Sequence, residues 1–215
     1  MKQVQTHDGS HTFYSEKAGE HYHSISGAET EAVGKYVYPL NPLSHIRNHN
    51  LRMLDVCFGL GYNTAAIIDT VWEEDHTTHI DLYAIENDEV ILEHIQDVHP
   101  NFLCYPIIRS LAKDKKYTGP HMKAKLYVDD LQSCLNEFKD IDIICFDPFS
   151  PKKNPELWTQ KVFEMCYAAL KPGGALATYS CARSVRNAMV AAGFQVFDTK
   201  PVGRRAPGTL ARKIE

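Results

Sequence analysis

The sequence contains no continuous apolar run of about eighteen residues, the length at which a membrane-spanning helix becomes feasible. Its first residues lack a basic stretch followed by an apolar segment, so we expect no signal peptide. None of the six cysteines belongs to a C-x-x-C pair, which excludes zinc-ribbon and dithiol redox motifs by spacing. We therefore expect a cytoplasmic protein whose cysteines are reduced and mostly buried.

The chain also lacks an excess of basic residues. Its 23 Lys and Arg stand against 27 Asp and Glu, which gives a formal net charge of -4. Nucleic-acid-binding proteins usually carry a clear basic excess, so any nucleic-acid surface here must be a local patch. The 215 residues and the apolar fraction of 44% suffice for one α/β domain with a sizeable core.

From residue 51 onward, apolar strand-like segments alternate with helical ones. We predict strands over residues 51–57, 79–86, 125–128, 141–146, 175–179, 194–197 and 209–214. Such alternation predicts an α/β fold with a mostly parallel sheet and helices on both faces. A short loop rich in Gly and Arg joins the last two segments, which predicts an antiparallel last strand.

The N-terminal part of the chain follows a different pattern. Residues 11–15 predict a strand, residues 20–23 its hairpin partner, and residues 27–38 a helix that ends at prolines. We therefore predict a hairpin and helix appendage over residues 1–45, followed by the main domain over residues 46–215.

A glycine-bearing turn follows the first predicted strand of the main domain. Residues 55–63 read D-V-C-F-G-L-G-Y-N. Gly59 and Gly61 allow a sharp turn and a close approach of a ligand to the start of a helix. Position 64 is Thr, so the third glycine of a nicotinamide-binding loop is missing. A turn that only packs a helix onto a sheet remains an alternative.

Acidic residues end three successive predicted strands. Glu86 ends the second strand, where a carboxylate can accept both ribose hydroxyls of an adenosine. Asp129 and Asp130 end the third strand, where they can take the adenine amino group, and Asp147 ends the fourth. These ends meet at the edge where such sheets bind ligands. Any one of the acids, Asp130 in particular, could instead cap a helix.

The fourth strand leads into residues 147–151, Asp-Pro-Phe-Ser-Pro. This segment resembles the Asp/Asn-Pro-Pro-aromatic motif of methyltransferases that modify amino groups. Proline has no N–H and leaves carbonyls free, so Asp147 and such a carbonyl can accept hydrogen bonds from a substrate nitrogen. Phe149 can stack on a planar base. The alternative is a proline-rich turn that Asp147 caps.

A long ordered series of motifs runs through the chain. It comprises residues 8–12 (DGSHT), 19–24 (GEHYHS), 57–63 (CFGLGYN), 147–158 (DPFSPKKNPELW), 177–180 (ATYS) and 191–194 (AAGF). In this order they resemble the methyltransferase part of the MnmC family, bacterial proteins that modify the wobble uridine of tRNA. The resemblance extends over nearly the whole chain.

The resemblance implies a Rossmann-like class I methyltransferase fold with S-adenosylmethionine as cofactor. It also implies methyl transfer to the primary amine of 5-aminomethyl-(2-thio)uridine at the tRNA wobble position, which gives the 5-methylaminomethyl product. Two features depart from the family. Cys57 stands where glycine is usual, and the flavin-dependent oxidase part of the fused proteins has no counterpart, so we expect a stand-alone methyltransferase.

The motifs and the resemblance together give a set of candidate site residues. Asp147 is the candidate catalytic residue, because it can accept the proton of the amine or orient the neutral nitrogen. The cofactor candidates are Asp55, Phe58, Gly59, Gly61, Asn63, Glu86, Asn87, Asp129, Asp130 and Asp147. The substrate candidates are Pro148, Phe149, Lys152, Lys153, Arg183, Arg204 and Arg205, with Arg186 as a further cation for tRNA phosphates.

Other interpretations stay open beside this one. The acidic net charge fits an amine methyltransferase that acts on a protein or a small molecule, and a non-catalytic cofactor-binding module is a further alternative. Most exposed Lys and Arg side chains only solvate a surface. His21 and His23 share one strand face, but no third ligand is evident. We expect no metal, no membrane contact and a monomer.

Overall fold

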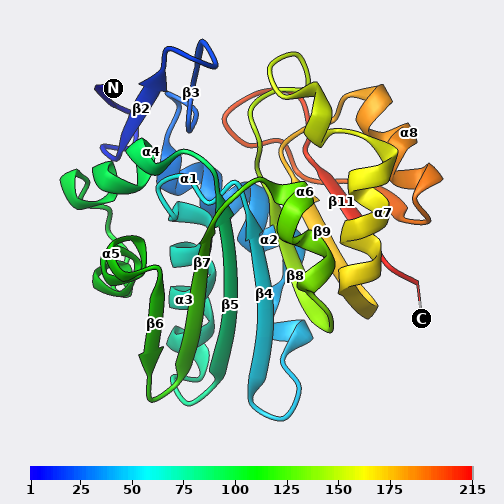
Figure 1. The fold of residues 1–215 in the computed structure, drawn as a ribbon, viewed down its shortest axis with the longest axis horizontal. Helices are drawn as coiled ribbons and strands as arrows, with labels where there is room; N and C mark the ends of the chain where they lie inside the picture. Colours follow the sequence, from blue (N-terminus) through cyan, green and yellow to red (C-terminus); the bar gives the residue numbers. More distant parts are fainter. Residues whose placement is uncertain (215) are drawn as a thin grey trace.

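The computed structural model describes residues 1–214 and shows an eight-stranded sheet with helices on both faces (Figure 1). In spatial order the strands are β10 (Gln195–Asp198), β11 (Thr209–Arg212), β9 (Leu170–Thr178), β8 (Ile141–Phe146), β4 (Asn50–Val56), β5 (His79–Glu86), β7 (Met122–Val128) and β6 (Lys116–Gly119). The parallel part of the sheet consists of β9, β8, β4, β5 and β7, while β6 and β11 pair antiparallel with β7 and β9. This confirms the α/β fold with a mostly parallel sheet and an antiparallel last strand.

The strand order places β4 between β5 and β8, so the direction in which the chain builds the sheet reverses there. In open α/β sheets, ligands bind outside the carboxyl ends of the strands at such a reversal. The glycine loop, residues 57–63, follows β4, and Asp147 follows β8 directly. The topology therefore brings two of the predicted motifs to one point.

The helices form two layers, each with its own apolar core. Met53 and Leu54 are adjacent in β4 but lie in different cores, because successive strand residues point to opposite faces. One layer contains α1 (Ala28–Ala32), α3 (Tyr62–Glu74), α4 (Glu89–His94) and α5 (Tyr105–Asp114), and the other contains α6 (Leu131–Cys134), α7 (Gln160–Ala169) and α8 (Arg183–Ala191). Short 3-10 segments are η2 (Pro42–His45), η3 (Ile95–Asp97), η4 (Leu135–Glu137) and η5 (Pro155–Leu157).

Within residues 1–214 no helix has the length and apolar character needed to cross a membrane.

The N-terminal segment forms a small sheet of its own above one end of the large one (Figure 1). Strands β1 (Lys2–Gln5), β2 (His11–Ser15) and β3 (Glu20–His21) pair antiparallel, which confirms the predicted hairpin and adds β1. The helix that follows buries its apolar residues in the same core as α3. The boundary near residue 45 stays a prediction.

The predicted helix over residues 27–38 changes its winding in the middle. After α1 the chain forms a π-helical turn, η1 (Val33–Val37), and then the short α2 (Tyr38–Leu40). A Cβ at Gly34 would lie 2.6 Å from a methyl carbon of Val202, so glycine lets the C-terminal loop pack directly on this turn. Such turns often occur at functional sites.

Candidate active site

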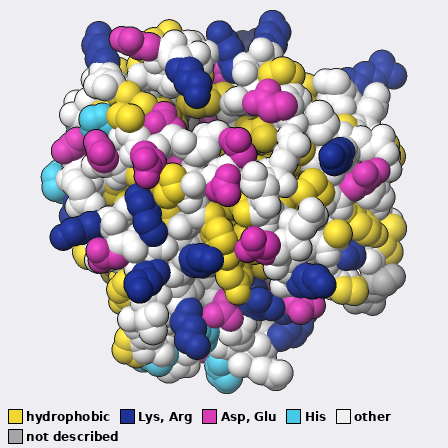
Figure 2. All heavy atoms as spheres, viewed as in Figure 1, with side chains coloured by type: hydrophobic (Ala, Val, Ile, Leu, Met, Phe, Trp, Pro, Cys, Tyr) yellow, Lys and Arg dark blue, Asp and Glu magenta, His cyan; other side chains and the backbone are white. Residues whose placement is uncertain are grey.

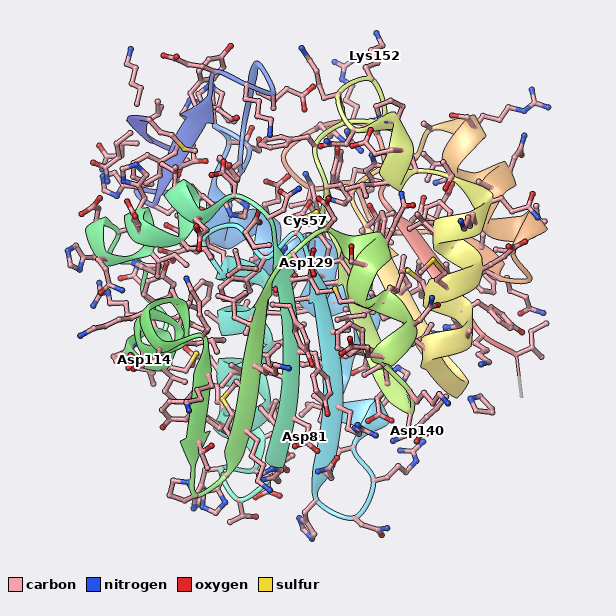
Figure 3. The ribbon with its side chains drawn as sticks, viewed as in Figure 1. Cys57, Asp81, Asp114, Asp129, Asp140 and Lys152 are labelled. Carbon is pink, nitrogen blue, oxygen red and sulfur yellow. The ribbon has the colours of Figure 1, made fainter. Side chains whose placement is uncertain are left out.

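A cleft of about 1010 Å³ lies at the carboxyl ends of β4, β5, β7 and β8, under the N-terminal hairpin. This volume is at the upper end of the range for small-molecule sites. Figure 3 places Cys57 and Asp129 at this end of the sheet and Asp81 and Asp140 at the opposite end. The motifs predicted from the sequence therefore meet at one edge, as their positions at strand ends require.

The glycine loop adopts backbone angles that its two glycines make possible. Gly59 and Gly61 have φ of 53° and 73°. A Cβ at Gly61 would lie 2.6 Å from Ile108 and 2.7 Å from Phe58, so a larger residue there would push the loop away from α5. Gly59 faces the cleft and has room around it, which allows a ligand to approach its backbone.

Cys57 takes the left-handed conformation, with φ of 62°. The family that the sequence resembles usually has glycine here, and the backbone angle explains why glycine suits the position. The thiol lines the cleft, and burial raises its pKa well above the usual value. Cys57 is therefore a protonated, strained wall residue of the cleft.

Glu86, the last residue of β5, is hydrogen-bonded to the glycine loop. Its carboxylate accepts hydrogen bonds from the backbone N–H groups of Gly59 and Asp88, both at 2.9 Å. Burial raises the pKa of Glu86, and the two N–H donors oppose that shift by stabilising the anion. The carboxylate oxygens lie at the cleft, where a ribose diol can donate to them.

Residues that follow β5 and β7 line the far end of the cleft. Asn87, Asp129 and Asp130 all line it, and the Asn87 amide donates to Asp130 at 2.9 Å. Asp130 precedes α6 but makes no side-chain cap bond to it, so the alternative of a helix cap does not account for its carboxylate. These acceptors suit an exocyclic amino group such as that of adenine.

Asp147 lies on the opposite side of the cleft floor, directly after β8. The Asn63 amide donates to its Oδ2 at 2.8 Å, and the Tyr36 hydroxyl lies beside the same carboxylate. Burial, followed by the charge of Glu31, raises the pKa of Asp147 to about 6, against the opposing effects of Tyr36, Asn63 and Lys35. The Tyr36 hydroxyl is buried and, in the described part of the chain, has no hydrogen bond of regular geometry. Asp147 is thus oriented and ionised at neutral pH.

The loop after Asp147 is held by aromatic side chains. Trp158 donates its indole N–H to the Phe149 carbonyl at 2.9 Å, and Tyr179 donates its hydroxyl to the Pro148 carbonyl at 3.0 Å. Two of the carbonyls expected to be free for substrate already accept a bond. Each has a second lone pair, but Asp147 is the main acceptor that the loop offers.

The N-terminal hairpin is tied across the cleft by polar and aromatic contacts. Glu20 accepts hydrogen bonds from the Ser150 backbone N–H at 3.0 Å and from its hydroxyl at 2.5 Å. Tyr22 donates to Asp88 at 2.6 Å, and its ring meets Phe149 edge-on with 4.9 Å between centroids. The hairpin therefore bridges the loop after β5 and the loop after β8.

The structure brings most candidate residues to the cleft and leaves others outside its lining. Asp55 is fully buried, accepts from the Thr64 hydroxyl at 2.6 Å, and has its pKa raised by burial to about 8. It supports the start of α3 and does not reach the cleft. The candidates that line the cleft are Gly59, Glu86, Asn87, Asp129, Asp130, Asp147, Pro148, Phe149, Lys153 and Arg204, whereas Asp55, Phe58, Gly61, Asn63, Lys152, Arg183 and Arg205 do not.

Arg186 serves the fold rather than the cleft. Its guanidinium pairs with Asp198 at 2.5 Å and donates to the Thr209 hydroxyl at 3.0 Å and the Gly208 carbonyl at 3.1 Å. With its donors engaged in this way, Arg186 is a poor candidate for a phosphate contact.

Several residues at the cleft were not among the sequence candidates. They include Glu20, Tyr22, Glu31, Lys35, Asp88 and Tyr179. Glu20 and Tyr22 fall within a stretch that carried the family resemblance, which was the only signal for them. Glu31 and Lys35 show an ordinary i, i+4 spacing in a helix, and nothing in the sequence points them toward β8. Within residues 1–214, no cluster of three metal-ligating side chains occurs.

Comparison with known proteins decides the family. Residues 93–214 match the model of a family described as S-adenosyl-L-methionine-dependent methyltransferase. The chain belongs to this family. The methyltransferase therefore uses S-adenosylmethionine, and the glycine loop, Glu86 and the Asp129–Asp130 end of the cleft fit an adenosine ligand. The cofactor inferred from the sequence is confirmed.

Individual relatives confirm the resemblance to MnmC. The methyltransferase is 25% identical over 207 residues to the tRNA 5-methylaminomethyl-2-thiouridine biosynthesis bifunctional protein MnmC of Leptospira interrogans, covering 89% of this chain and 32% of that one. It is 30% identical over 220 residues to an uncharacterized protein of Methanocaldococcus jannaschii, covering 98% of this chain and 59% of that one. The crystal structure of MNMC2 from Aquifex aeolicus matches with a TM-score of 0.84 and 29% identity, over 98% of this chain and 69% of that one. The chain thus spans only part of these relatives.

Proposed function

We propose that the methyltransferase transfers a methyl group from S-adenosylmethionine to the primary amine of 5-aminomethyl-(2-thio)uridine at the wobble position of tRNA. The observation that carries this proposal is the oriented carboxylate of Asp147, which Asn63 holds at the cleft floor. The relationship to MnmC proteins supports the choice of tRNA as the carrier of the amine.

The charge of the cleft favours a cationic substrate. Eight acidic residues line it against four basic ones, and an acidic low-dielectric cleft concentrates cations. S-adenosylmethionine carries a sulfonium, and an alkylamine with a pKa of about 10 arrives as an ammonium. The acidic residues are Glu20, Glu31, Glu86, Asp88, Asp129, Asp130, Asp147 and Glu156, and the basic ones are Lys17, Lys35, Lys153 and Arg204.

The reaction requires the amine to lose one proton before it attacks. S-adenosylmethionine supplies the electrophilic methyl group. Asp147 accepts a hydrogen bond from the ammonium, takes its proton or passes it to solvent, and leaves the nitrogen lone pair facing the methyl carbon. The N–C bond forms while the S–C bond breaks, so the products are the methylammonium, S-adenosylhomocysteine and one released proton. Because Asp147 must be ionised, the rate should fall below pH 6.

Basic side chains at the rim of the cleft supply the proposed tRNA contact. Figure 2 shows Lys and Arg side chains along the upper edge of the molecule, and Figure 3 places Lys152 at the tip of the loop there. Arg204 lies over the Tyr179 ring and donates to the carbonyls of Tyr179 and Pro207. Lys152, Lys153 and Arg204 can neutralise phosphates beside the amine. The acidic cleft and net charge also keep a small-molecule or protein amine as a second candidate substrate.

The test is methyl transfer to defined tRNA. Purified protein is incubated with labelled S-adenosylmethionine and tRNA that carries 5-aminomethyl-2-thiouridine, and the nucleosides are analysed by mass spectrometry. The control is the same tRNA with an unmodified wobble uridine. One added methyl on the aminomethyl nucleoside alone is the expected result. Binding of the cofactor without this product would reject the tRNA substrate and turn the search to other amines.

A further inference from the structure

We propose that Glu31 and Lys35 complete the amine subsite: Glu31 is a second carboxylate contact for the substrate ammonium beside Asp147, and Lys35 positions Glu31 and offsets its charge. This inference rests on the proposed amine chemistry and deepens it. Three observations support it: the ion pair between Glu31 and Lys35, the π-helical turn that contains Lys35, and the cleft wall that both residues share with Asp147.

The ion pair is buried at the cleft. Lys35 is only 6% exposed, its ammonium contacts Glu31 Oε1, and it lies 5.8 Å from the centre of the Tyr179 ring. Both charged residues line the cleft together with Asp147. A buried ion pair is weak evidence of a stability role, because desolvation offsets most of the attraction. Its position at the cleft calls for a functional explanation.

The π-helical turn brings Lys35 to the cleft beside Asp147. Lys35 and Tyr36 are consecutive residues of η1, and both influence the charge on Asp147. Within residues 1–214, the Tyr36 hydroxyl is completely buried beside Asp147 without a hydrogen bond of regular geometry. The turn thus places two polar groups, Lys35 and Tyr36, near the carboxylate, while Glu31 precedes it in α1.

Glu31 retains acceptor capacity for a substrate. Its Oε2 accepts from the Ser24 backbone N–H at 2.8 Å, and its Oε1 contacts Lys35. A carboxylate has about four lone-pair sites, so these two donors leave room for a third. An ammonium between Glu31 and Asp147 would face two carboxylates and only one lysine, which selects a cationic nitrogen over a neutral hydroxyl.

The charged groups around Asp147 determine its pKa and therefore the acidic limb of the pH–rate profile. The titratable or charged groups that interact with it come from the helix, strands and loops around it: Glu31, Lys35, Tyr36, Asp55, Cys57, Cys145 and Tyr179. Glu31 raises the pKa of Asp147 and Lys35 lowers it. Substitution of one or the other should therefore move the acidic limb of the rate profile in opposite directions.

The first experiment uses two analogues and no tRNA. Sinefungin carries a primary amine where S-adenosylmethionine carries its methylsulfonium, whereas S-adenosylhomocysteine is neutral there. Calorimetry gives the ratio of their affinities for wild type, Glu31→Gln and Lys35→Met. Glu31→Gln keeps an acceptor for Ser24 and should lower the preference for sinefungin by about tenfold, while Lys35→Met should raise it. Glu29→Gln, on the same helix but outside the cleft, should leave it unchanged.

S-adenosylhomocysteine affinity reports whether each variant is folded. If a single variant no longer binds S-adenosylhomocysteine, the double variant Glu31→Gln/Lys35→Met is used in its place, because it buries no unpaired charge. The double variant should also have a lower preference for sinefungin than wild type. An unchanged ratio in Glu31→Gln or in the double variant would overturn the inference.

The second experiment is the pH profile of kcat/KM with the aminomethyl tRNA. The acidic limb should move to lower pH in Glu31→Gln and to higher pH in Lys35→Met. A purely structural role would lower the rates without these opposite shifts. Failure of the wild type to methylate the tRNA would reject the proposed substrate, and the analogue ratio would still decide the role of Glu31.

Discussion

The Asn63 side chain donates a hydrogen bond of 2.8 Å to Oδ2 of Asp147, which links the first turn of α3 to the end of β8. The amide oxygen of Asn63 has no hydrogen-bond partner within residues 1–214. The sequence suggested that Asn63 contacts the cofactor, whereas the structure places it behind the cleft, where it orients the carboxylate.

Removal of this bond should slow the reaction more than it weakens binding. In Asn63→Ala the carboxylate can rotate, and a small misplacement of a reacting group costs up to about 100-fold in rate. We expect the rate of methyl transfer to fall by about 10- to 100-fold, with S-adenosylhomocysteine affinity within about threefold of wild type. Single-turnover assays and calorimetry measure the two quantities. An unaltered transfer rate would show that Asp147 needs no support from Asn63.

The bond between Glu20 and Ser150 should control how fast the cofactor product leaves. Glu20→Gln removes the charge that strengthens two hydrogen bonds across the cleft, and we expect S-adenosylhomocysteine to dissociate about tenfold faster. The matched control is Glu16→Gln, an exposed residue of the same hairpin. Stopped-flow displacement gives both rates. Equal rates in Glu20→Gln and wild type would mean that the hairpin does not retain the product.

Cys57 stores backbone strain that glycine would release. Because its φ is 62°, Cys57→Gly should be more stable than Cys57→Ala, which keeps the Cβ, by about 1 kcal/mol in the free energy of unfolding. Urea denaturation of the two variants measures this difference. If the alanine variant is the more stable one, position 57 holds no backbone strain that glycine relieves.

Asp55 should make stability fall as the pH rises. Its folded pKa of about 8 exceeds the ordinary value of 3.8, so the folded protein holds a proton that the unfolded chain releases between these limits. Asp55→Asn removes this pH-dependent loss of stability. Between pH 3.8 and about pH 8, the free energy of unfolding of the variant relative to wild type should therefore rise by about 1.4 kcal/mol per pH unit. Exposed Asp114→Asn is the control. A difference that does not depend on pH would show that Asp55 titrates normally.

Much of the fold could be predicted because its strands are apolar runs between breakers. The bounds of β5 and β8 coincide with the predicted residues 79–86 and 141–146. The missed strands β1 and β6 lie at sheet edges, and most of their residues are exposed and polar. Edge strands of this kind have no apolar pattern to reveal them.

The site was harder to predict because it depends on which way a residue faces. Asp55 and Asp147 both accompany strand ends, yet one is sealed behind the glycine loop and the other reaches the cleft. Glu31 and Lys35 come to Asp147 only because the helix that carries them packs beside α3. Such packing follows from the whole tertiary structure rather than from local spacing.

Single-turnover methyl transfer by wild type and Asp147→Asn, on tRNA carrying 5-aminomethyl-2-thiouridine, tests the central claim most directly. The asparagine keeps the size of the side chain but cannot take a proton. We expect transfer to slow by about 10²- to 10⁴-fold, while S-adenosylhomocysteine affinity stays within about threefold. Equal rates for the two proteins would contradict the role of Asp147 as the group that prepares the amine for attack.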